Sequence, residues 1–145
     1  MVKVLFDTSI LVASFLKAHP KHTLCANWWQ KVRSGEIEGI IASHTLAETY
    51  SVLTRIPLRP RISPSVAQQL IQENLKEFEV ISLAPPDYEI VIKQMVELNL
   101  TGGAIYDALI AQVALKAKVD RLLTLNPKHF TRLGENIANL VQVLD

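Results

Sequence analysis

Residues 1–9 read Met-Val-Lys-Val-Leu-Phe-Asp-Thr-Ser, and this stretch decides the fold. The apolar run over residues 2–6 has the length of a strand and is rich in β-branched and aromatic residues. Such a run favours a strand that is buried on both faces of a parallel sheet. Asp7 then stands at the carboxyl end of the strand, and a helical pattern follows over 8–17. Ligands of open α/β sheets bind at this edge, where helix N-termini point their amides.

The rest of the chain alternates between helical and strand patterns. We expect helices over 22–33, 45–56, 63–75, 85–98 and 104–117, strands over 39–43, 80–83, 121–125 and 140–144, and a short helical or turn segment over 126–132. This alternation predicts an α/β fold with right-handed crossovers and a parallel sheet that carries helices on both faces. The order of the strands does not follow from the pattern.

Length and composition indicate one domain over residues 1–145, large enough to bury a single core. The net charge of +1 neither requires nor excludes a nucleic-acid partner, because phosphate binding depends on local basic patches. The single cysteine, Cys25, excludes an internal disulfide framework and favours a reducing, cytoplasmic compartment. Since no apolar run approaches about 20 residues, we expect no membrane span.

Three acidic residues, Asp7, Glu48 and Asp107, lie at or near the start of predicted helices. Each has a purely structural explanation: Asp7 suits a helix N-cap, Glu48 has capping-box spacing from Thr45, and Asp107 favours the positive end of its helix. Asp7 and Glu48 also follow predicted strands, so they would meet at one edge of the sheet. Small residues flank Asp107 and allow the start of its helix to approach the same edge: Gly102, Gly103, Ala104 and Ala108. Carboxylates ~4 Å apart repel by about 4 kcal/mol at an effective dielectric near 20, and a bound divalent cation removes that repulsion.

Oxygen-only ligation by a few carboxylates favours Mg²⁺ or Mn²⁺. Such an ion lowers the pKa of bound water and stabilises charge at phosphorus, so phosphodiester hydrolysis is the expected reaction. Thr124 and Asn126, near the end of the predicted strand 121–125, offer a hydroxyl and an amide for a metal-bound water, although Asn before Pro is also a common turn. His44 and His129 lie near the same strand ends, and we assign them no catalytic role.

Four segments, taken in order, resemble the PIN-domain ribonucleases, and most closely the VapC-type toxins of toxin–antitoxin pairs. They are Leu5-Phe-Asp-Thr-Ser9, Ser43 to Glu48, Gly103-Ala-Ile-Tyr-Asp107-Ala-Leu-Ile-Ala, and Leu122-Leu-Thr-Leu-Asn-Pro-Lys-His-Phe130. The resemblance spans almost the whole chain. It implies a three-layer α/β/α sandwich with a central, mainly parallel sheet, and Mg²⁺- or Mn²⁺-dependent endonucleolytic cleavage of single-stranded RNA.

The resemblance also implies roles for individual residues. Asp7, Glu48 and Asp107 match the core acids of the family; Asp7 and Asp107 are expected to bind the metal directly, and Glu48 to bind it directly or through water, or to help deprotonate the attacking water. The supporting residues are Thr8, Ser9, Thr124 and Asn126. Many members have Asn in place of Ser9 and a fourth acid in place of Asn126; the second difference puts tight binding of a second metal ion in doubt.

A homodimer and a cognate antitoxin are further implications of the resemblance. Exposed apolar surface on the first two helices, including Trp29, is a candidate for either contact, whereas core packing is the alternative explanation of most of this surface. Candidate RNA-phosphate contacts, chosen from charge alone, are Arg55, Arg59, Arg61, Lys128 and Arg132.

Other functions remain open at this point. A catalytically silent PIN scaffold that binds RNA or protein is the main alternative, and the three intact acids argue against it. A phosphotransferase of the haloacid-dehalogenase class would need a second Asp at the position of Ser9. A response-regulator receiver domain would need an acidic pair where the N-terminal stretch supplies one acid.

Overall fold

The computed structural model describes residues 1–144 and contains a five-stranded, fully parallel sheet in the order β3-β2-β1-β4-β5. The strands are β1 (Lys3–Phe6), β2 (Glu38–Ala42), β3 (Glu79–Ile81), β4 (Arg121–Leu123) and β5 (Val141–Gln142). The predicted parallel sheet is therefore confirmed. Three strands are shorter than predicted: β3, β4 and β5.

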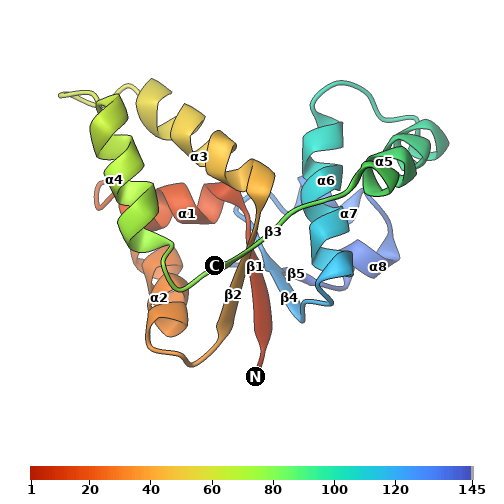
Figure 1. Cartoon of the computed structure of the whole chain (residues 1–145), viewed down its shortest axis with the longest axis horizontal. Helices are drawn as coiled ribbons and strands as arrows, with labels where there is room; N and C mark the ends of the chain where they lie inside the picture. The colour runs from red at the N-terminus through yellow and green to blue at the C-terminus, as the bar shows by residue number, and fades with distance from the viewer. Residues whose placement is uncertain (145) are drawn as a thin grey trace.

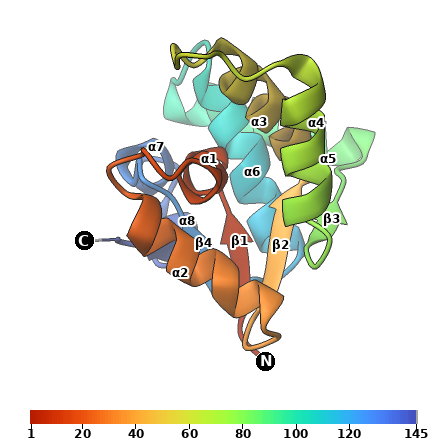
Figure 2. The same ribbon diagram turned by 90° about the vertical axis from the view of Figure 1, so that its left-hand side faces the viewer.

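Helices cover both faces of the sheet, which confirms the three-layer α/β/α sandwich (Figure 1). One face carries α1 (Thr8–Phe15), α2 (His22–Arg33), α3 (Ser43–Arg55) and α4 (Pro64–Asn74). The other carries α5 (Pro85–Leu98), α6 (Ala104–Lys116), α7 (Lys128–Thr131) and α8 (Glu135–Ala138). Figure 2 views the molecule from the side of the first face, with α1, α2 and α4 nearer to the viewer than the strands. Among residues 1–144, no helix combines the length and apolar character needed to cross a membrane.

The alternation of side chains along β1 divides the core between the two layers of helices. Leu5 packs in a buried cluster with residues of α5 and α6, whereas Val4 and Phe6 pack in a cluster with residues of α1 and α2. All three side chains are fully buried. Successive residues of a strand point to opposite faces, so a continuous apolar run is what a sheet covered on both sides requires.

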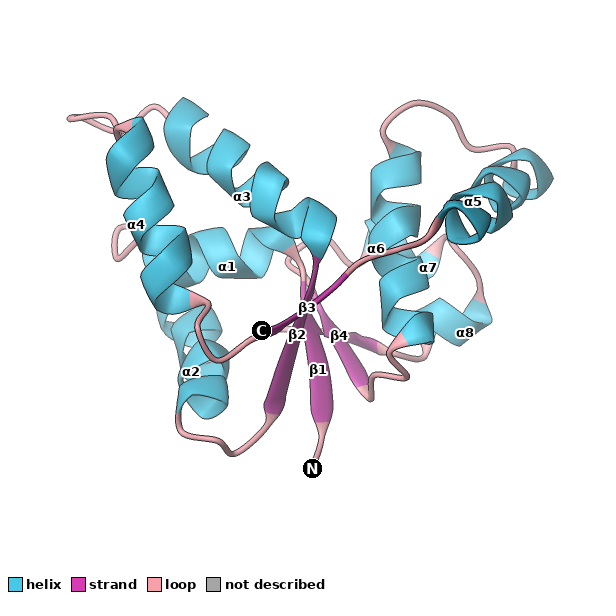
Figure 3. Ribbon diagram, in the orientation of Figure 1, coloured by secondary structure: helices cyan, strands magenta, loops and turns pink. Residues whose placement is uncertain are grey.

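The strand order places a topological switch point between β1 and β4. The chain moves from β1 to β2 and β3 on one side and then crosses to β4 on the other side of β1. The backbone N–H of Asp7 donates to the carbonyl of Leu123 at 3.0 Å, which joins the ends of these two strands. Figure 3 shows α1 and α3 beginning at this carboxyl edge of the sheet. Crevices at switch points are the usual ligand sites of open α/β sheets.

Helix α3 begins at Ser43, two residues before the predicted start. Thr45 therefore lies inside the helix, fully buried, and no capping box joins it to Glu48. The prediction of a capping box is wrong, because the strand passes into the helix without an intervening loop. Glu48 occupies the second turn and is free to face another element.

Within residues 1–144, α1 and α2 carry no large apolar side chain that is classed as exposed, so core packing explains most of their apolar surface. Trp29 is partly buried, and its indole N–H donates to the carbonyl of Asn74 at 2.8 Å. Exposed apolar side chains are instead concentrated on α5, where Val96 is 76% exposed and Ile92 is 53% exposed.

Candidate functional site

Asp7 stands between β1 and α1, at the N-cap position of the helix, but its side chain makes no capping hydrogen bond. The carboxylate is 6% exposed. Its Oδ2 accepts hydrogen bonds from the hydroxyls of Ser9 at 3.0 Å and Thr124 at 2.9 Å. The interpretation of Asp7 as a simple helix cap is therefore wrong, because two hydroxyls from different elements hold the carboxylate.

Backbone amides orient both of these hydroxyls. Ser9 Oγ accepts from the N–H of Leu125, and Thr124 Oγ1 accepts from the N–H of Asn126, each at 3.0 Å. A hydroxyl has one proton to donate, so an amide on its acceptor side leaves that proton for Asp7. Burial raises the pKa of Asp7 and the two hydroxyls counteract this, while the charge of Glu48 adds to the rise.

Glu48 reaches back from α3 to the start of α1. Its Oε1 accepts a hydrogen bond of 2.6 Å from the hydroxyl of Thr8, which is itself buried. The other carboxylate oxygen lies 3.7 Å from Nε2 of His44, one helical turn earlier. Because Thr8 directly follows Asp7 in the chain, this hydrogen bond joins Glu48 to the segment that carries Asp7.

Asp107 enters from the opposite layer, in the first turn of α6. Gly102, with a φ of +60°, shapes the loop before this helix in a conformation that glycine adopts without strain. Oδ2 of Asp107 lies 3.7 Å from Nδ1 of His129 and 3.6 Å from the guanidinium of Arg132. Burial raises its pKa to about 6; the charges of Asp7 and Glu48 add to this, and the neighbouring His129 and Arg132 oppose it.

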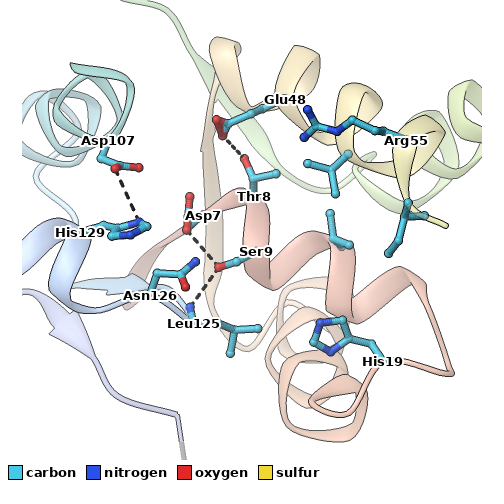
Figure 4. A pocket seen from close by; sticks show the side chains of 13 residues that line it. Asp7, Thr8, Ser9, His19, Glu48, Arg55, Asp107, Leu125, Asn126 and His129 are labelled. Atoms are coloured by element: carbon cyan, nitrogen blue, oxygen red, sulfur yellow. Dashed lines mark hydrogen bonds and ion pairs between the residues drawn. The ribbon is translucent and has the colours of Figure 1, made fainter. Parts of the chain in front are cut away.

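The three acids line one pocket of about 500 Å³. Figure 4 shows Asp7, Glu48 and Asp107 projecting toward this common space from the β1–α1 junction, α3 and α6. Val12, Val52 and Ile56 form an apolar end beside Arg55 and His19. The prediction that the acids meet at the carboxyl edge of the sheet is confirmed as a matter of position. Their chemical roles stay predictions.

The chemistry of this donor set fits a hard divalent cation. Carboxylate and hydroxyl oxygens dominate the acidic end, and burial, with added repulsion from Asp7 and Glu48, raises the pKa of Asp107. Within residues 1–144, no three Asp, Glu, His or Cys side chains are close enough to enclose one ion. Mg²⁺ commonly takes one or two protein carboxylates and completes its shell with water and substrate phosphate, so full enclosure is not required.

The remaining predicted residues divide into two groups. The pocket is lined by Thr8, Ser9, Arg55 and Asn126. Thr124 does not line it but donates a hydrogen bond to Asp7, which does. The other candidate RNA contacts are exposed and are not among the residues that line the pocket: Arg59, Arg61 and Lys128.

The sequence analysis did not predict the contacts that three side chains make with the acids. His129 and Arg132 contact Asp107, although Arg132 was selected only as an RNA-phosphate contact. His44 lies against Glu48. Two signals were available: both histidines lie near predicted strand ends, and His44 stands four residues before Glu48, just ahead of the predicted helix 45–56. The contacts of Asp107 depend on how α7 packs against α6.

Comparisons with known proteins identify the family of this chain. The PIN domain family model matches residues 4–136. Ribonuclease VapC27 of Mycobacterium tuberculosis is 32% identical over 114 residues, which cover 79% of this chain and 78% of the relative. Ribonuclease VapC40 of the same species is 36% identical over 118 residues, covering 81% and 82%.

Solved structures extend the likeness to the fold. VapBC2 from Rickettsia felis, solved bound to a DNA fragment from its promoter, matches with a TM-score of 0.70 at 22% identity, over 99% of this chain and 100% of that chain. The extent of the family match and the identity to two curated ribonucleases lead to one assignment: the chain is a VapC-type member of the PIN-domain family.

Proposed function

We propose that this protein is a divalent-metal-dependent endoribonuclease that hydrolyses phosphodiester bonds of single-stranded RNA. The observation that carries the proposal is the gathering of Asp7, Glu48 and Asp107 in one pocket from three separate elements. A protein does not gain stability from this arrangement, because burial and repulsion work against the ionised carboxylates. The family assignment supports the same conclusion, since the curated relatives are named ribonucleases.

The bound cofactor in this proposal is Mg²⁺ or Mn²⁺. Asp7 and Asp107 would hold it directly, and Glu48 directly or through water. When bound, the ion would lower the pKa of the attacking water and stabilise negative charge on the phosphate.

The protein's own residues prepare this centre. The amide-oriented hydroxyls of Ser9 and Thr124 hold Asp7 in one position, and Thr8 does the same for Glu48. In this proposal Glu48 would accept a proton from the attacking water; its Oε2 makes no hydrogen bond within residues 1–144, which supports this role. Preoriented donors lower the reorganisation needed during the reaction.

Arg55 is the strongest candidate for an RNA-phosphate contact, because it lines the pocket beside Glu48. Arg59, Arg61 and Lys128 would extend the contact outside the pocket. Each phosphate contact makes binding weaker at higher salt concentration.

The same proposal includes a role as the toxin of a toxin–antitoxin pair in the cytoplasm. Two of the similar structures support an antitoxin partner: VapBC2 of Rickettsia felis and a toxin–antitoxin complex from Klebsiella pneumoniae. Growth arrest on expression, relieved by the product of a neighbouring small gene, is the expected behaviour. Unrestrained growth at a verified level of the active enzyme would contradict this role.

We also propose that the protein forms a homodimer through α5. The exposed Ile92 and Val96 are one turn apart, so they share one face of this helix. Light scattering should give the mass of two chains for the wild type and of one chain for the Ile92→Lys, Val96→Lys double variant. A single-chain mass for the wild type would contradict the dimer.

The experiment that tests the ribonuclease proposal measures cleavage of labelled single-stranded RNA with Mg²⁺, with Mn²⁺ and with EDTA. The wild type should cleave with either metal and lose activity in EDTA, whereas Asp7→Asn should be inactive with its fold intact by circular dichroism. Glu36→Gln, at an exposed acid in the loop before β2, is the matched control and should retain activity. Cleavage by Asp7→Asn at the wild-type rate would refute the mechanism. RNA binding without cleavage by the wild type would favour the silent scaffold.

A further inference from the structure

The rings of His44 and Tyr106 form a stack beside the acidic pocket. Their centroids are 5.2 Å apart and their planes differ by 4°. His44 lies in the first turn of α3 and Tyr106 in the first turn of α6, so the stack bridges the two helices. These helices cover opposite faces of the sheet (Figure 1).

The stack adjoins two of the three acids. Tyr106 directly precedes Asp107 in the chain, and Nε2 of His44 lies 3.7 Å from the carboxylate of Glu48. Along α3, the side chains of His44, Glu48 and Val52 follow at intervals of four residues, which places them on one face at steps of about 6 Å. Val52 lines the apolar end of the pocket. Glu48 therefore lies between the aromatic stack and the apolar end of the pocket.

Tyr106 keeps an open surface although it is stacked. The residue is 50% exposed, and the His44 side chain keeps 35% exposure. A tyrosine ring has two faces, and His44 covers only one of them. In the described residues no hydrogen bond is made by the Tyr106 hydroxyl, so an interaction of this group with the protein does not explain its position.

We propose that Tyr106, held by His44, is a stacking platform for the nucleobase of a nucleotide next to the scissile phosphate; this inference rests on the proposed ribonuclease function. A strand that lies along α3 with its phosphate at Glu48 brings a neighbouring base to the stack. Three carboxylates repel the RNA backbone, so a neutral contact to a base is a favourable means of holding the strand at this position. Stacking on an aromatic ring accepts any base, because every base has a π-face.

The test measures binding of fluorescein-labelled single-stranded RNA by anisotropy, in EDTA, with Asp7→Asn as the background so that the RNA stays intact. Adding Tyr106→Leu should weaken binding about 5- to 150-fold, the range for loss of one stacked base. Adding Tyr106→Phe should change binding less than about twofold, because the ring is kept. Tyr50→Leu is the matched control: Tyr50 is 40% exposed on α3 and lines a separate pocket against α4.

A set of RNAs, each with one abasic position, distinguishes the loss of base stacking from a change in the shape of the protein. One abasic position should weaken binding to the protein that keeps Tyr106 and have no further effect on the Tyr106→Leu protein. Three results would overturn the proposal. Tyr106→Phe and Tyr106→Leu could lower RNA affinity equally, the abasic position could weaken binding to Tyr106→Leu as much as to the protein that keeps Tyr106, or the protein could bind no RNA at all. Wild-type cleavage is measured in parallel. Cleavage with no effect of Tyr106→Leu rejects the platform alone, whereas the stacking signature without cleavage rejects the ribonuclease function alone.

Discussion

Replacing Asp107 by Asn is expected to stabilise the folded protein above neutral pH while abolishing cleavage. The substitution keeps the shape of the side chain and removes one buried negative charge. Functional sites often carry such a conflict, because a carboxylate that serves a metal ion is held where the fold would favour a neutral group.

The magnitude follows from the pKa of this carboxyl. Burial raises it from 3.8 to about 6, and one pKa unit corresponds to about 1.36 kcal/mol. The ionised group therefore destabilises the fold by at most about 3 kcal/mol at pH 8. The Asp107 side chain keeps 22% exposure, and solvent screening reduces the expected gain to about 1–2 kcal/mol, or ~2–8 °C in Tm.

The sign of the pH dependence is also determined. Because the pKa of Asp107 is higher in the folded chain than in the unfolded chain, its protonated form favours folding. The wild type and Asp107→Asn should be equally stable below about pH 4, and their difference should grow as the pH rises through about 6.

Urea denaturation of both proteins at pH 5 and pH 8, without divalent metal, measures the effect. The gain in free energy of unfolding should be about twice as large at pH 8 as at pH 5. Glu36→Gln makes the same change in net charge at an exposed position and should show no such gain. A gain that is equal at the two pH values, or a loss of stability at pH 8, would refute the reasoning.

Further substitutions test other parts of the account. Thr124→Val removes a hydroxyl that donates to Asp7 and should lower kcat about tenfold in cleavage assays; an unchanged kcat would contradict its orienting role. Thr49→Val removes a buried hydroxyl that has no partner in residues 1–144 and should raise the free energy of unfolding by about 1 kcal/mol in urea. Asn126→Asp adds a fourth acid to the pocket and should tighten Mn²⁺ binding in calorimetry while lowering metal-free stability. Gly39→Ala places a Cβ 2.7 Å from buried side chains and should lower the free energy of unfolding by about 1–3 kcal/mol.

Local sequence signals were sufficient for the architecture and for the position of the acids. The apolar run that ends at Asp7 predicted a buried strand, and β1 occupies the centre of the sheet. Parallel strands end at a common edge, so residues that follow β1 and β2 were expected to meet there. For Asp107 the signal was the set of small residues around it, which allow its helix to approach that edge, and the PIN-type motifs gave the same residue.

Long-range packing decided what the sequence left open. The strand order depends on which strands pair across the chain. The pairing of Glu48 with Thr8, 40 residues apart, replaced the expected local capping box because α3 starts at Ser43. The contacts of His129 and Arg132 with Asp107 likewise join separate elements. Sequence spacing carries no signal for such contacts.

The most direct test of the central claim measures Mn²⁺ binding by electron paramagnetic resonance and RNA cleavage on the same samples of wild-type and Asp7→Asn protein. The account predicts that, in the wild type, bound Mn²⁺ and cleavage rate rise together over the same metal concentrations, and that both are lost in Asp7→Asn. Tight Mn²⁺ binding by Asp7→Asn, or wild-type cleavage at full rate without bound metal, would contradict it.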